Sequence, residues 1–283
     1  MACFDEIIRV GEGEARLRVS LWDDLPDFQY GKKRPMILVI PGGGYHYVAE
    51  REGDPIAMSF QAMGYQTAVL TYSVMPTAWP QQLLEAAAAV KLIREKAEAW
   101  HVDPAKLATA GFSAGGSLAA ELGVHWQEPW LAEAVGADCP EQLRPDLQIL
   151  VYAVLGVDRY PQLATRGTVR PGDSFVGKEA DAPVRYVSEH TPPTFLAHAL
   201  GDALVTAEQS LYFAEALRKA GVPFSLHIYQ NGPHGFALGN QVTYYDAAPG
   251  SQSQAPRPGC ALWVEQAGLW LEEHFHSFEE AEA

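Results

Sequence analysis

Apolar and polar residues alternate near the start of the chain, between Glu6 and Asp23, with a break at residues 11–13. A period of two residues is typical of half-exposed strands, so this segment is predicted to form a hairpin. Residues 36–40 are instead a continuous apolar run, which is the pattern of a strand covered on both faces. Further strands are predicted at residues 65–72, 106–112, 147–155, 194–200 and 224–229.

Helical spacing of apolar residues marks the segments between these strands. The clearest helix is predicted at residues 80–101, where apolar side chains recur every three or four positions. Other helices are predicted at residues 54–63, from about 116, at 207–220 and at about 261–275. Strands that alternate with helices predict a doubly wound α/β fold, in which a mostly parallel central sheet is flanked by helices on both faces.

Two stretches do not fit this alternation. Residues 160–191 are rich in Pro, Gly and charge, and residues 241–258 contain a Ser, Gln, Pro and Gly run. Both are predicted to be surface excursions, and in open α/β sheets such excursions often border the ligand crevice.

The length and composition predict one globular unit. Nothing in the 283 residues resembles a linker, so a single α/β domain is predicted over residues 1–283. The formal net charge of −15 argues against nucleic acid or an anionic membrane surface as a partner, because its field repels both. No apolar run has the length of a membrane span, and the amino terminus lacks the apolar region of a secretory signal.

The cysteines point to a reducing compartment. Cys3, Cys139 and Cys260 are odd in number and far apart, which favours free thiols in the cytoplasm over a disulfide framework. None belongs to a C-x-x-C pair, so a structural zinc site has no support. The oligomeric state is left open, a homo-oligomer included.

Ser113 lies in the run GFSAGG at residues 111–116, between a predicted strand and a predicted helix. A strand that turns directly into a helix puts the bend residue in a strained conformation, and a Cβ at Gly111 or Gly115 would collide with a neighbouring element. The bend exposes the Ser113 hydroxyl at the positive end of the following helix. This is the position of a nucleophile.

A serine nucleophile needs a base and a group that orients the base. Asp202 and His234 each follow a predicted strand, and the order Ser, Asp, His is the order this fold uses. His234 is predicted to take the Ser113 proton, and Asp202 to fix the imidazole tautomer. Asp158 also follows a strand and is the rival orienter; Asp202 is favoured because it lies one strand nearer to His234.

The developing oxyanion needs hydrogen-bond donors. The run PGGGY at residues 41–45 ends a predicted strand with three glycines, whose N–H groups can point into a loop unobstructed. The predicted donors are the backbone N–H groups of Gly43, Gly44 and Ala114. Among the other chemistry-bearing residues, His198 lies inside a strand run and is predicted to be a packed core residue.

Four runs of the chain together resemble the α/β-hydrolase superfamily. They are PGGGY, GFSAGG, GDALV at residues 201–205 and PHGF at residues 233–236. More narrowly they resemble its acetyl esterase/lipase branch, which includes acetyl-xylan and feruloyl esterase-like (BD-FAE-like) enzymes, over about residues 35–275. The resemblance implies Ser113, Asp202 and His234 as a triad. It also implies Gly43, Gly44 and Ala114 as the oxyanion hole.

The sequence departs from a neighbouring branch in two places. Pro41 stands where the hormone-sensitive-lipase branch has histidine, and no long amino-terminal cap is present, which weakens the case for lipid substrates. The predicted function is a serine carboxylic-ester hydrolase that works through an acyl-enzyme and needs no metal or cofactor. Its predicted substrate is a small-molecule or oligosaccharide ester with a short acyl group, and the resemblance implies acetylated xylo-oligosaccharides.

Two alternatives differ in class. A prolyl-oligopeptidase-like peptidase shares the serine elbow, but it carries a large propeller for which the chain has no room. A non-catalytic receptor or scaffold with a hydrolase fold usually lacks a triad member, and here all three are present. Exposed aromatic residues could stack on sugars, although large aromatic side chains are more often part of the core. The candidates are Tyr45, Tyr47, Trp79, Trp126, Tyr244 and Tyr245.

Overall fold

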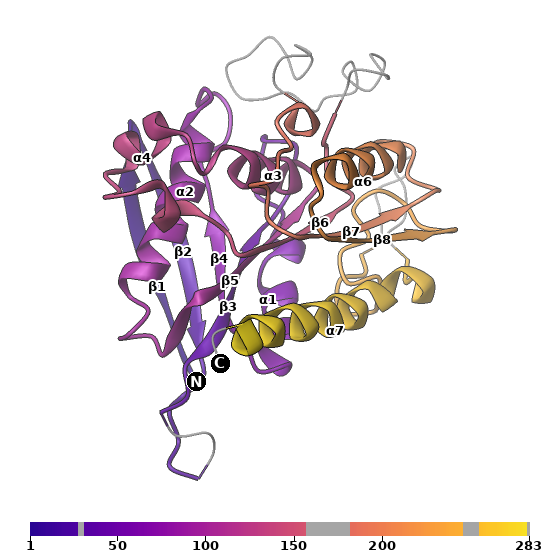
Figure 1. The fold of residues 1–283 in the computed structure, drawn as a ribbon. Helices are drawn as coiled ribbons and strands as arrows, with labels where there is room; N and C mark the ends of the chain where they lie inside the picture. Colours follow the sequence, from indigo (N-terminus) through magenta and orange to yellow (C-terminus); the bar gives the residue numbers. More distant parts are fainter. Residues whose placement is uncertain (28–30, 157–181, 246–254, 282–283) are drawn as a thin grey trace.

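One eight-stranded sheet forms the centre of the computed structural model, which describes residues 1–27, 31–156, 182–245 and 255–281 (Figure 1). The strand order is β1-β2-β4-β3-β5-β6-β7-β8. β1 and β2 form an antiparallel hairpin that joins β4 antiparallel, and the six strands from β4 to β8 along the sheet are parallel. The predicted hairpin and the mostly parallel sheet are therefore confirmed.

The strands are β1 Ala2–Val10, β2 Gly13–Leu21, β3 Arg34–Ile40, β4 Gln66–Thr71, β5 Val102–Phe112, β6 Leu147–Val151, β7 Thr194–Ala199 and β8 Phe224–Tyr229. The helices are α1 Asp54–Ala62, α2 Gln81–Glu95, α3 Ala114–His125, α4 Pro129–Val135, α6 Glu208–Ala220 and α7 Pro258–Ala281. Short 3-10 helices occur at η1 Glu50–Glu52, η2 Pro140–Leu143 and η4 Pro183–Arg185.

Helices cover both faces of the sheet (Figure 1). α1 and α7 pack on one face through a core that includes Phe60 and Trp263. α2, α3, α4 and α6 pack on the other face, where Leu83 and Leu118 belong to a second core. The continuous apolar runs of the parallel strands are explained by this double cover, because each of their faces meets a helix layer.

The predicted helix at residues 80–101 is too long at its carboxyl end. α2 ends at Glu95, the chain turns, and His101 takes a left-handed φ of +50° before β5 begins at Val102. β5 starts early because Val102 pairs with Arg34 of β3. α4 was not predicted, since its seven residues are too few to show a helical period. α7 begins before and ends after its predicted bounds.

Parallel strands bring their carboxyl ends to one edge of the sheet. The segments that follow β3, β5, β6, β7 and β8 therefore leave the sheet on the same side, and every predicted site residue belongs to one of them. Of the two predicted excursions, residues 182–191, 241–245 and 255–258 are described. The rival orienter Asp158 lies outside the described residues.

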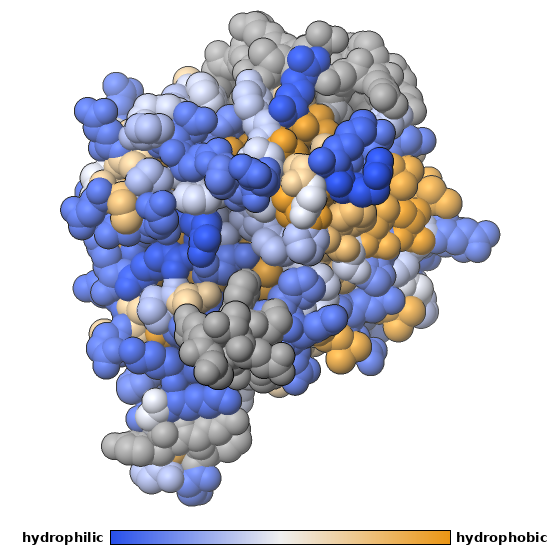
Figure 2. Space-filling view, viewed as in Figure 1, coloured by the Kyte–Doolittle hydropathy of each residue, from blue (hydrophilic) through white to orange (hydrophobic). Residues whose placement is uncertain are grey.

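The viewed face of the molecule is mostly hydrophilic (Figure 2), as expected for a formal net charge of −15. Hydrophobic colour gathers toward the side where α6 and β8 lie. Exposed leucines near these elements are Leu200, Leu204 and Leu211. Among the described residues, no helix combines the length and apolar character that a bilayer span requires.

Candidate active site

Ser113 occupies the sharp bend between β5 and α3. Its backbone has φ +52° and ψ −117°, a strained conformation for a residue with a Cβ. The bend is held by backbone hydrogen bonds, since the Ser113 N–H donates to Val151 O and the Ser113 carbonyl accepts from the Ser117 N–H. The sharp strand-to-helix bend that the sequence predicts at Ser113 is therefore present.

The flanking glycines are required by close packing. A Cβ on Gly111 would lie 2.5 Å from the carbonyl oxygen of Gly115 in α3. A Cβ on Gly115 would lie 2.1 Å from the carbonyl oxygen of Ile40 and 2.3 Å from that of Pro41. The absence of side chains lets the start of α3 approach the end of β3, which brings Ser113 beside the glycine loop, residues 41–45.

Substitution of Gly115 by alanine is expected to lower both stability and hydrolytic activity. The new Cβ meets backbone atoms that cannot move aside, and overpacking of this kind typically costs about 1–3 kcal/mol. Thermal melting and steady-state kinetics measure the two effects. Gly259→Ala is the matched control, because a Cβ there meets no atom within 4 Å and α7 gains a better helix former. Wild-type melting and rate in Gly115→Ala would show that the contact between α3 and β3 is not tight.

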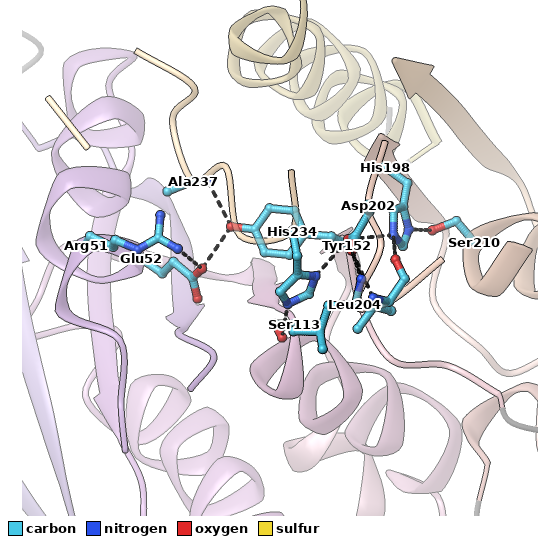
Figure 3. A network of polar contacts seen from close by, with 11 residues as sticks. Arg51, Glu52, Ser113, Tyr152, His198, Asp202, Leu204, Ser210, His234 and Ala237 are labelled. Carbon is cyan, nitrogen blue, oxygen red and sulfur yellow. Dashed lines mark hydrogen bonds and ion pairs between the residues drawn. The ribbon is translucent and has the colours of Figure 1, made fainter. Parts of the chain in front are cut away.

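Ser113, His234 and Asp202 come together at this edge of the sheet (Figure 3). Ser113 Oγ lies 2.8 Å from His234 Nε2, and His234 Nδ1 lies 2.7 Å from Asp202 Oδ2. The carboxylate can only accept, so Nδ1 carries the ring proton and Nε2 can accept the proton of Ser113. The arrangement can thus take a proton from the serine hydroxyl during nucleophilic attack.

Asp202 is buried and heavily hydrogen-bonded. Its Oδ1 accepts the N–H groups of Leu204 at 3.0 Å and Val205 at 2.9 Å. Burial alone would raise its pKa, but hydrogen bonds from His198 and His234 outweigh burial and lower the pKa of Asp202 to about 2. The aspartate is therefore ionised at neutral pH, and it can stabilise a positive charge that forms on His234.

His198 has a role beyond packing. The predicted core position is confirmed, since the residue is fully buried in β7. Its Nε2 lies 3.3 Å from Asp202 Oδ2 and 2.9 Å from Val205 O, and its Nδ1 lies 2.8 Å from Ser210 Oγ. His198 thus helps to hold the Asp202 carboxylate in place. The only sign of this contact in the sequence was the position of His198 near the end of a strand, four residues before Asp202.

The glycine loop lies directly beside Ser113. Gly43 and Gly44 have φ of +122° and +61°, and a Cβ on Gly43 would lie 1.9 Å from the carbonyl oxygen of Tyr47. A Cβ on Gly42 would lie 2.8 Å from Ser113 Cβ. Ala114 is the first residue of α3, where backbone N–H groups have no partner within the helix. The predicted donors therefore come from two segments that meet at Ser113.

Two residues near the site were not predicted from the sequence. Glu52 of η1 is buried, and its Oε2 accepts the N–H of Gly42 at 2.8 Å. Tyr152 follows β6, and its ring lies edge-on to the His234 ring with centroids 5.3 Å apart. Neither position carries a local signal, because Glu52 is one of several charged residues in its stretch and Tyr152 continues an apolar run.

The candidate sugar-stacking aromatics divide into two groups. Tyr45 and Trp126 are buried, so they serve as core residues. The other four candidates are exposed and stay candidates for contact with a sugar: Tyr47 at 63%, Trp79 at 42%, Tyr244 at 39% and Tyr245 at 44%. In the part of the chain that is described, no group of three or more His, Cys, Asp or Glu side chains could hold a metal ion.

Comparison with known proteins finds relatives that are longer than this chain. The chain is 32% identical over 236 residues, 78% of its length, to endo-1,4-beta-xylanase B of Butyrivibrio fibrisolvens. It spans 35% of that relative, and between 35% and 58% of the curated relatives it matches. The matched segment of the relatives is thus only part of longer proteins.

Two solved structures match almost end to end. The carboxylesterase Cest-2923 of Lactobacillus plantarum superposes with a TM-score of 0.84 at 27% identity, over 97% of this chain and 98% of that one. An acetyl ester-xyloside bifunctional hydrolase from Caldicellulosiruptor lactoaceticus superposes with a TM-score of 0.74 at 31% identity, over 93% and 89% of the two chains. These are carboxylic-ester hydrolases by name, and the fold they share with this chain is the α/β-hydrolase fold.

The model of the BD-FAE family matches residues 25–217, more than half of the chain. The match includes Ser113 and Asp202 and stops before His234, which the structure nonetheless places against both. The resemblance predicted from four short runs is confirmed, and the chain belongs to the BD-FAE family of α/β-hydrolases.

Proposed function

We propose that this protein is a serine carboxylic-ester hydrolase that forms an acyl-enzyme on Ser113. The observation that carries the proposal is the pair of short contacts from Ser113 Oγ to His234 Nε2 and from His234 Nδ1 to Asp202. Membership of the BD-FAE family and the carboxylesterase structure that matches the chain nearly end to end support the same reaction class.

The proposed reaction has two halves. Ser113 Oγ attacks the ester carbonyl carbon as its proton passes to His234 Nε2, and the carbonyl oxygen becomes an oxyanion. Backbone N–H groups of Gly43, Gly44 and Ala114 stabilise that oxyanion. When the tetrahedral intermediate collapses, the alcohol leaves with the proton from His234. A water molecule then repeats the sequence on the acyl-enzyme, releasing the acid and restoring the Ser113 hydroxyl.

Asp202 supports both halves of this reaction. Its ionised carboxylate holds the His234 proton on Nδ1, so that Nε2 faces Ser113 as the acceptor. When His234 becomes protonated, the adjacent negative charge lowers the energy of the imidazolium. No step requires a metal or a cofactor.

The proposed substrate is a short-acyl ester, with acetyl groups on xylo-oligosaccharides as the leading candidate. The family match and the acetyl ester-xyloside hydrolase that superposes over 93% of the chain support this choice. We place the reaction in the cytoplasm, where already shortened oligosaccharides would be deacetylated after import; three cysteines without a disulfide partner are compatible with that compartment.

A substrate panel tests the proposal. The wild-type chain should hydrolyse p-nitrophenyl acetate faster than the butyrate and the octanoate, and it should release acetate from acetylated xylo-oligosaccharide. A chromogenic aminoacyl-peptide run alongside tests the peptidase alternative. Cleavage of the simple esters without acetate release from the oligosaccharide would remove the carbohydrate substrate and leave the ester mechanism. Cleavage of the peptide alone would overturn the esterase proposal.

A further inference from the structure

Glu52 and Tyr152 link two loops that both lie beside Ser113, the glycine loop and the loop that carries His234. Glu52 Oε2 accepts the N–H of Gly42 in the glycine loop at 2.8 Å. Glu52 Oε1 accepts the hydroxyl of Tyr152 at 3.0 Å, and that hydroxyl accepts the N–H of Ala237 at 3.0 Å. Ala237 follows His234 in the histidine loop, residues 232–238. Gly42, Glu52, Tyr152 and Ala237 therefore form one continuous chain of hydrogen bonds between the two loops. Figure 3 shows its part from Glu52 through the Tyr152 hydroxyl to Ala237.

Both side chains of this link are buried. Glu52 is 2% exposed and Tyr152 is fully buried, and a buried polar group is costly unless its hydrogen bonds are made. Each oxygen of Glu52 accepts a hydrogen bond, as a carboxylate does, and the Arg51 guanidinium lies 3.6 Å from Oε1. Burial, and after it the Glu52 carboxylate, raises the pKa of Tyr152 well above its ordinary value, so the hydroxyl keeps the proton that it donates.

The two ends of this hydrogen-bonded link contact the glycine loop and the histidine loop, whose relative positions the proposed reaction requires to be fixed. Gly42 packs against Ser113, as the 2.8 Å distance from its hypothetical Cβ to Ser113 Cβ shows, and it precedes the proposed donors Gly43 and Gly44. At the other end, the Tyr152 ring lies edge-on to both His234 and Phe236, with centroids 5.3 Å and 4.6 Å apart. Arg51 also reaches the histidine loop, since a Cβ on Gly235 would lie 2.6 Å from its Nη2.

We infer that Glu52 and Tyr152 are positioning residues that hold the oxyanion donors and the base His234 in one fixed geometry about the reacting carbonyl. The inference rests on the proposed function and extends it to two residues outside the proposed triad and the proposed oxyanion donors. Because the donors must already be aimed where charge develops, a loop that drifts by a fraction of an ångström loses transition-state stabilisation more than substrate binding.

Glu52→Gln and Tyr152→Phe test this link with nearly isosteric changes. A glutamine offers one acceptor oxygen where the Gly42 N–H and the Tyr152 hydroxyl need two, and a phenylalanine leaves the Ala237 N–H without its partner. With p-nitrophenyl acetate, each variant should lower kcat about 10- to 100-fold and leave KM within about threefold. The double variant should be no slower than the slower single one, because both changes break the same link.

Glu85→Gln is the matched control. Glu85 is fully buried and also accepts several hydrogen bonds, but from Ser73 and Gln81 rather than from the glycine and histidine loops. It should lower the melting temperature as much as Glu52→Gln while kcat stays near wild type. Wild-type kcat in Glu52→Gln and Tyr152→Phe, a multiplied loss in the double variant, or an equal loss of kcat in Glu85→Gln would each overturn the inference.

The rate at which a fluorophosphonate labels Ser113 gives a readout that does not depend on the natural substrate. Labelling uses the same base and the same donors, so it should slow in Glu52→Gln and Tyr152→Phe and stay near wild type in Glu85→Gln. If the wild type is labelled but cleaves none of the esters, the substrate proposal fails and the labelling rates still decide the inference. A wild type that is not labelled at all would overturn the proposed nucleophile and this inference together.

Discussion

Ser113→Ala should reduce ester hydrolysis by about 10⁴- to 10⁶-fold, down to the small rate that binding and the oxyanion donors supply alone. The substitution removes the only atom that can form the acyl-enzyme in the proposed mechanism, and it leaves His234 without the hydroxyl that lies 2.8 Å from Nε2. Steady-state kinetics with p-nitrophenyl acetate measure the loss. Mass spectrometry after fluorophosphonate treatment should find the label on wild-type Ser113 and none on the variant.

Ser117→Ala is the control for this experiment. Ser117 lies one turn further along α3 and its hydroxyl contacts Glu121 at 3.4 Å, so the same chemical change is made in the same helix outside the proposed site. It should keep a rate near that of the wild type, because the hydroxyl that is lost contacts Glu121 and not His234. A wild-type rate in Ser113→Ala would show that another group is the nucleophile.

Asp202→Asn should lower kcat by about 10⁴-fold while the fold is retained. The carboxylate now fixes the His234 proton on Nδ1 at 2.7 Å. An amide nitrogen in its place donates rather than accepts, which favours the tautomer with the proton on Nε2, where it blocks transfer from Ser113. Kinetics with p-nitrophenyl acetate measure the loss, and an unchanged kcat would show that another group orients His234.

The same variant has a consequence for acid stability. The pKa of Asp202 is about 2 in the folded protein, below its value of about 3.9 in an unfolded chain. A lowered pKa stabilises the fold above the unfolded pKa, and this contribution of about 2 kcal/mol is lost as pH falls from about 4 through about 2. Between about pH 4 and about pH 2, the free energy of unfolding of Asp202→Asn should therefore fall less than that of the wild type. Urea-unfolding curves recorded at several pH values across this range measure the difference.

Asp146→Asn serves as the control for Asp202→Asn in the kinetic assay. Asp146 is also a buried carboxylate, and it accepts hydrogen bonds from Arg94 and from the Leu107 N–H. It directly precedes β6, so it lies at the edge of the sheet opposite the one where Ser113 follows β5. Its replacement should reduce stability and leave kcat near wild type. A comparable fall in kcat would mean that loss of a buried charge, rather than loss of the tautomer, causes the defect.

Much of the proposed site follows from local sequence. Close contacts between adjacent elements require glycine two positions before and two positions after Ser113. A Cβ on Gly115, for example, would lie 2.1 Å from Ile40 O. Asp202 and His234 could be predicted because parallel strands bring their carboxyl ends to one edge of the sheet, so residues that directly follow such strands lie at the same edge as Ser113. The alternation of apolar runs with segments of helical period predicted the parallel sheet and the helix layers on its two faces.

The tertiary structure decided the contacts between segments that no local pattern relates. Glu52 meets Tyr152 across 100 positions of sequence, and His198 reaches Asp202 only because the chain after β7 folds back on the strand. Such pairs depend on the register of the sheet and on where each loop crosses it. Neither of these can be predicted from the residues next to a side chain in the sequence. Periodicity identifies which residues are buried; the three-dimensional packing determines which buried polar groups become each other's partners.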